Sequence, residues 1–82
     1  MSEGMSGKEF IEIFKENGLA RSPTVRILEE QIVILNKHAD EAVARGDLKA
    51  ADELHRLAEE TKWHAIDLAE VEKAQGYPFI TD

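Results

Sequence analysis

A short break between two long helical patterns lies in the segment AVARGDLKAA, residues 42–51. Gly46 follows the first pattern, and a glycine just past a helix end can adopt the left-handed backbone conformation that stops the helix. Asp47 comes next and is a favoured N-cap for the following helix. Because so short a connection makes its two helices antiparallel, this segment predicts a helical hairpin.

The helix before the break is expected at about residues 22–45. Ser22 is a good N-cap, and Pro23 suits the first helical position, where a missing N–H group loses no helical partner. Apolar residues then recur at helical steps of three and four. This stripe consists of Val25, Leu28, Ile32, Leu35, Ala39 and Ala42.

The helix after the break is expected at about residues 47–75, ending before Gly76. Its apolar stripe combines alanines with larger residues: Ala51, Leu54, Ala58, Thr61, Ala65 and Leu68. The small alanines should let the two backbones of the hairpin approach closely. Leu57, His64 and Val71 lie beside the stripe, so we expect His64 to be partly buried.

A shorter helix is expected at about residues 7–17, after a flexible leader of residues 1–6. Ser6 and Glu9 have the spacing of a capping box, in which each side chain accepts a hydrogen bond from the other residue's backbone N–H. The apolar residues that follow at helical spacing are Phe10, Ile11, Ile13 and Phe14.

The last segment, residues 77–82, cannot continue the helix because it contains Pro78. It carries Tyr77 and Phe79, and it is too apolar for a solvated tail, so we expect it to fold back or to dock on a partner. The patterns together predict an all-α fold with a short N-terminal helix and a long antiparallel helical hairpin. Residues 7–76 should form a single helical domain.

The composition limits how such a chain can be stabilised. A chain of 82 residues buries only roughly 60% of the surface that its unfolded form exposes. It has no cysteine, so neither a disulfide nor a thiolate zinc site can compensate. No signal peptide and no membrane-spanning apolar run is evident in the sequence, so we expect a cytoplasmic protein without a membrane partner.

One helical turn suggests self-association. The run Ile32-Val33-Ile34-Leu35 has no polar side. A helix that is apolar all round is normally buried all round, which needs the first helix or a second subunit. We therefore expect a homo-oligomer, a dimer or larger, completing a helical bundle. Its core is expected to include Leu28, Ile32, Ile34, Leu35, Leu54, Leu57 and Leu68.

The charge distribution favours a basic protein partner. Acidic residues number 17 against 10 basic ones, and residues 47–82 alone carry 9 acidic and 4 basic residues. Such a surface repels nucleic acid, which is bound through clustered Lys and Arg. The expected partner surface is Asp52, Glu53, Glu59, Glu60, Asp67 and Glu70, with the aromatic residues Trp63, Tyr77 and Phe79 as possible anchors. For Trp63 we expect cover from the first helix, the tail or another subunit, the alternative being an outward anchor.

The histidines raise the alternative of a metal site. His38 and His55 are placed symmetrically about the break, each near a carboxylate, and facing carboxylates and imidazoles hold iron or manganese in helical bundles. These residues flank the apolar stripes, however, where ordinary solvated charges lie. We therefore expect no metal and no cofactor. The alternative is a metal site across a dimer from Glu30, His38, His55, Glu60 and His64.

One segment resembles known helical hairpins. The pattern is Ala42-x-x-x-Gly46-x-x-x-x-Ala51-x-x-Leu54-x-x-x-Ala58-Glu59-Glu60-x-x-x-His64-Ala65. It is similar to the second half of a rubrerythrin or ferritin-like hairpin, which implies iron binding through Glu-x-x-His. Here Thr61 stands where that motif has its glutamate. The same pattern resembles tetratricopeptide and microtubule-interacting-and-transport hairpins, so it identifies no single family.

The sequence therefore predicts a non-enzymatic helical interaction protein, such as an oligomeric adaptor, an inhibitor, an antitoxin or a phage-type regulator. Its serines lie in the leader or at expected N-caps, which explains them without nucleophilic catalysis. One alternative is a metal-binding half-ferritin, with di-metal oxidase-like activity. Another is small-ligand binding within an oligomer, where Arg21, Arg26 and Lys37 could meet an anion.

Overall fold

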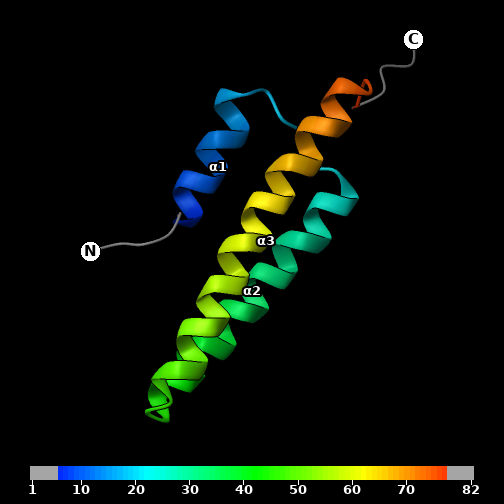
Figure 1. The fold of residues 1–82 in the computed structure, drawn as a ribbon. Helices are drawn as coiled ribbons and strands as arrows, with labels where there is room; N and C mark the ends of the chain where they lie inside the picture. Colours follow the sequence, from blue (N-terminus) through cyan, green and yellow to red (C-terminus); the bar gives the residue numbers. More distant parts are fainter. Residues whose placement is uncertain (1–5, 78–82) are drawn as a thin grey trace.

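A computed structural model describes residues 6–77 as three helices without a strand (Figure 1). Helix α1 spans Gly7–Glu16, α2 spans Pro23–Ala44 and α3 spans Leu48–Ala74. Each boundary lies within one residue of the expected range. The all-α fold with a short first helix and a long antiparallel hairpin is confirmed.

The helices begin at the caps that the sequence indicates. Ser6 and Glu9 form the complete capping box, with distances of 3.1 Å from Glu9 N to Ser6 Oγ and 2.9 Å from Ser6 N to Glu9 Oε1. Ser22 Oγ accepts a hydrogen bond of 3.2 Å from Val25 N, and this serine is buried. Asp47 caps α3 in the same way. The caps satisfy backbone donors that have no partner inside the helix.

The hairpin turn depends on Gly46, which has a φ of +80°. Its N–H donates to the Val43 carbonyl at 2.9 Å, and Asp47 N donates to the Ala42 carbonyl at 2.9 Å. These two bonds satisfy carbonyls at the end of α2 and turn the chain directly into α3. Only a residue without a Cβ adopts this backbone conformation without strain.

The two long helices pack side by side along their length (Figure 1). Apart from Val25, Ile32, Ile66 and Lys62, small residues occupy the buried positions of the hairpin. These are Ala39 and Ala42 from α2 and Ala51, Ala58, Ala65 and Ala69 from α3. The expected alanine stripe is thus the contact surface between the helices.

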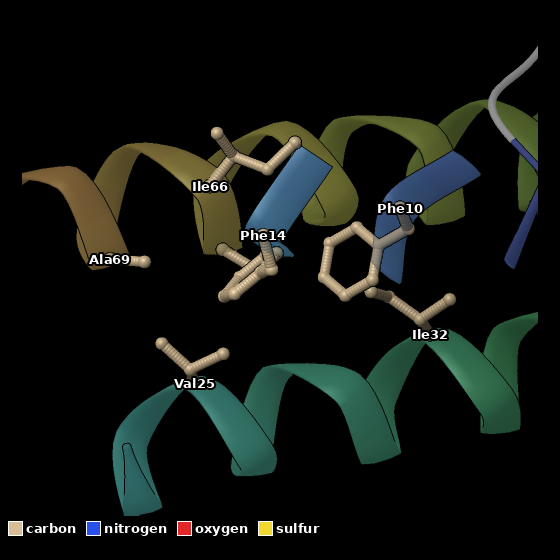
Figure 2. Close-up of a cluster of buried hydrophobic side chains, with 7 residues drawn as sticks. Phe10, Phe14, Val25, Ile32, Ile66 and Ala69 are labelled. Carbon is tan, nitrogen blue, oxygen red and sulfur yellow. The ribbon is translucent and has the colours of Figure 1, made fainter. Parts of the chain in front are cut away.

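The larger apolar cluster lies where α1 joins the hairpin. Phe10 and Phe14 of α1 have ring centroids 4.9 Å apart and a tilted arrangement, which suits aromatic pairs. Figure 2 shows both rings between α2 and α3, with Val25 and Ile32 on one side and Ile66 on the other. Helix α1 covers only the half of the hairpin away from Gly46 (Figure 1).

The apolar turn at residues 32–35 is therefore only partly covered. Ile32 is buried in the cluster that α1 forms with the hairpin, and its expected part in an oligomer core stays a prediction. Leu35 is half-buried, whereas Ile34 is 45% exposed and Val33 is also exposed. One short helix can cover one side of the turn, and the other sides remain open.

Candidate functional site

The first exposed surface is the outer face of α3. We define it by the acidic residues of the sequence prediction and the tryptophan among them. They are Asp52, Glu53, Glu59, Glu60, Trp63, Asp67 and Glu70. All are exposed except Glu59, which is half-buried. Helical spacing places them along one side of α3, since residues three and four apart are surface neighbours.

Trp63 is the prominent side chain of this face, with 50% of its surface exposed. Of the three covers expected for it, α1 supplies none, because α1 packs on the side of α3 that carries Ile66 and Ala69, and cover by the tail or another subunit stays a prediction. Glu59 and Glu60 lie one turn before Trp63, and Asp67 lies one turn after it. An exposed indole is therefore flanked by carboxylates on both sides.

Only part of this negative charge is neutralised within the chain. Arg56 pairs with Asp52 at 3.1 Å, and Lys62 lies 3.8 Å from Glu59. In contrast, Glu60 and Asp67 form no ion pair within residues 6–77. The carboxylates on either side of Trp63 thus remain available to a positively charged partner.

The aromatic residues after α3 are only partly described. Tyr77 is half-buried, and its N–H donates to the Glu72 carbonyl at 2.7 Å, which ties it to the end of α3. Phe79 and the remainder of the apolar tail lie outside the described residues, as do residues 1–5 of the expected leader. Their expected roles stay predictions.

A second exposed surface is the apolar face of the hairpin, on the side away from α1. It comprises Ile27, Leu28, Ile34 and Leu35 from α2 and Leu54, Leu57, Leu68 and Val71 from α3. Four of them are about half exposed: Ile27 58%, Ile34 45%, Leu57 49% and Val71 52%. The other four are half-buried, and two of them, Leu28 and Leu68, pack against the core cluster that contains Phe10 and Phe14.

Six of these eight residues belong to the oligomer core that the sequence predicts. The prediction left out Ile27 and Val71, although their spacing indicates them. Ile27 lies two helical turns before Ile34, and Val71 lies one turn after Leu68. Both therefore extend the same line of apolar side chains.

The histidines do not form a metal site within the described chain. His38, His55 and His64 are all exposed, as are Glu30 and Glu60. Within residues 6–77 there is no group of three or more His, Cys, Asp or Glu side chains able to hold a metal ion.

The expected partial burial of His64 is wrong. Its position on α3 follows the line of Leu57, Leu68 and Val71, away from both α1 and α2. His64 stays exposed with Leu57 and Val71, although Leu68 on the same line is half-buried. The spacing correctly predicted the side of α3 on which His64 lies. It did not show that another part of the chain would bury that side.

Of the three basic residues proposed for an anion site, Arg21 and Arg26 are engaged in hydrogen bonds, and Lys37 lies further along α2. Arg21 donates to both carboxylate oxygens of Glu29, at 2.6 and 2.8 Å. Hydrogen bonding and the charge of Glu29 raise the pKa of Arg21, so it stays charged. Arg26 Nε donates to the Arg21 carbonyl at 3.2 Å, and Lys37 is exposed on the middle of α2.

Searches against protein-family models, curated proteins and solved structures find no match for this chain. None of the described helices has both the length and the apolar character to cross a membrane. Function is therefore inferred from the two exposed surfaces of the chain itself.

Proposed function

We propose that this chain is a non-enzymatic interaction protein that binds a basic protein partner through the outer face of α3. The observation that supports this function is the half-exposed Trp63 with carboxylates one turn away on either side. Tryptophan is enriched among the residues that contribute most to binding at protein interfaces.

The chemistry of the face selects a cationic partner. An indole ring attracts Arg or Lys through its π face, and nearby Glu60 and Asp67 add charge attraction. The net charge of −7 speeds the encounter with a basic surface and disfavours nucleic acid and anionic lipid. Because the face lies on a preformed helix, binding needs little ordering of the backbone.

A role as inhibitor, antitoxin, adaptor or phage-type regulator follows if the partner's basic surface is itself functional. Covering such a surface with α3 would block its other ligands. The absence of cysteine fits a reducing compartment, and we place the protein in the cytoplasm.

Site-specific cross-linking tests this function. A photo-reactive phenylalanine analogue replaces Trp63 in the full chain, and in a control chain it replaces Val43, whose exposure of 49% matches that of Trp63. After irradiation in the native cell, mass spectrometry identifies the cross-linked proteins. We expect a protein with a basic surface to be cross-linked through position 63 and not through position 43.

Binding of that protein, once purified, should weaken as salt rises, because exposed charges are screened within about 10 Å at 0.1 M salt. Replacing Trp63 with alanine should weaken it at least tenfold, whereas Val43→Ala should not. Equal cross-links at both positions, or salt-independent binding, would show that the outer face of α3 is not the binding surface.

A further inference from the structure

The apolar face of the hairpin has no cover within residues 6–77, and we propose that a second copy of this chain covers it. Helix α1 cannot do so in the same chain, because it packs on the opposite side of the hairpin through Phe10 and Phe14. Two hairpins joined by these faces form a four-helix bundle, with one α1 on each outer side. This inference does not rest on the proposed function, which concerns a different face.

The spacing of the face on α3 is typical of a helix that packs against another helix. Leu54, Leu57, Thr61, His64, Leu68 and Val71 follow one another at steps of three and four. Apolar side chains at these steps form the seam of a coiled-coil contact, and four of the six residues here are apolar. It extends for about 25 Å along α3 at 1.5 Å per residue.

The area of the face suits a modest dimer. Four half-exposed and four half-buried aliphatic side chains leave roughly 500 Å² of apolar surface per chain, given the areas that aliphatic transfer energies imply. A patch of this size is comparable with the largest apolar patch on a typical monomer, which is often functional. A stable interface buries about 800 Å² per partner, so polar residues around the face would supply the remainder.

Charge favours a second copy over other occupants. The positions enclosed by the apolar residues hold Gln31, Thr61 and His64, whereas the nearest carboxylates on the same lines, Glu41 and Glu53, lie at the end of the face toward Gly46. Two acidic chains can therefore bring the middle parts of their faces together without opposing their carboxylates. The Thr61 hydroxyl donates to the Leu57 carbonyl at 2.8 Å, so burial would leave its donor satisfied. A basic partner gains nothing from the uncharged middle of the face.

Residues 78–82 by themselves are too short to cover the whole face. Residues 78–82 reach about 17 Å when fully extended. Leu57 lies about 25 Å along α3 from Ala74, given the rise of 1.5 Å per residue. Those residues could cover at most the end of the face that holds Leu68 and Val71.

Measurement of the mass in solution tests the inference with a matched pair of variants. Leu57 and Val43 are each 49% exposed, but Val43 lies three turns after Ile32, on the other side of α2 and beyond α1. By sedimentation equilibrium at micromolar concentrations, the native chain and Val43→Lys should be dimers. Leu57→Lys should raise the dimer dissociation constant at least tenfold. A native chain that stays monomeric, or equal masses for the two variants, would overturn the inference.

Cysteine cross-linking is a second test of the dimer, which is needed if Leu57→Lys alters the fold. The chain has no cysteine, so a single introduced thiol can be followed without background. Thr61 lies near the middle of the face, where a two-fold axis brings a residue close to its own copy. Under mild oxidation Thr61→Cys should form a disulfide-linked dimer much faster than Asp67→Cys on the outer face of α3. Equal rates would exclude pairing through the apolar face.

Discussion

Lys73 of α3 donates a hydrogen bond of 2.6 Å from its Nζ to the backbone carbonyl of Asn17, which ends α1. The two residues are 56 positions apart in sequence. Carbonyl groups at a helix C-terminus carry partial negative charge, so a cation is well placed there. The contact fastens the end of α1 to the last turn of α3.

Replacing Lys73 with methionine should loosen α1 while keeping the aliphatic stem. We expect the free energy of unfolding to fall by about 1 kcal/mol, the usual contribution of one hydrogen bond. Hydrogen exchange at the α1 amides should accelerate, because they lose a tether to the hairpin. Lys49→Met, near the hairpin turn, is the control, and equal effects of the two variants would contradict the tether.

Replacing Phe14 with alanine should be the most damaging single change in the core. Phe14 is 3% exposed and lies between α2 and α3. Buried Phe→Ala changes cost about 3–5 kcal/mol, comparable with the whole stability of a small domain. Ile11→Ala, at a position 43% exposed, should cost much less. Urea denaturation followed by circular dichroism compares them, and similar midpoints would mean that α1 does not pack through Phe14.

The two serine caps should differ in importance. Ser22 is buried, whereas Ser6 is exposed at the start of α1. Ser22→Ala should cost about 1–2 kcal/mol and Ser6→Ala about 0.5 kcal/mol, because water can replace an exposed cap but not a buried one. Thermal denaturation of the two variants measures the difference, and the reverse order would contradict the buried position of Ser22.

Alanine substitutions at two glycines should have opposite signs. Gly46→Ala should destabilise by about 1–2 kcal/mol, because its φ of +80° is unfavourable for a residue with a Cβ. Gly7→Ala should stabilise by about 0.5 kcal/mol, since Gly7 is helical and nothing lies within 4 Å of the added Cβ. The melting temperatures should move in opposite directions. A shift of the same sign would show that the hairpin turn does not need its glycine.

Local signals in the sequence were sufficient for the helices. Ser6, Ser22 and Asp47 mark the starts, and Gly46 marks the turn, because caps and left-handed glycines act within a few residues. The apolar face was also largely predicted, since periodicity places each residue on one side of its helix.

Which side of each helix is buried by the rest of the chain could not be predicted in the same way. Periodicity assigns Ile32, Trp63 and His64 to sides of their helices, but the docking of α1 decides which of those sides is buried. Phe10 and Phe14 insert between the helices at Val25 and Ile66, which buries Ile32 and leaves Trp63 and His64 exposed. That choice depends on contacts between residues far apart in sequence, which a single sequence pattern does not contain.

Fluorescence quenching of Trp63 most directly tests whether the outer face of α3 stays open and negatively charged. Trp63 is the single tryptophan of the chain, so its emission needs no assignment. At a concentration where the chain has associated, we expect efficient quenching by caesium and weaker quenching by iodide, because the surrounding carboxylates attract the cation and repel the anion. Protection of Trp63 from both ions, or quenching by iodide as strong as by caesium, would show that this face is covered or not acidic.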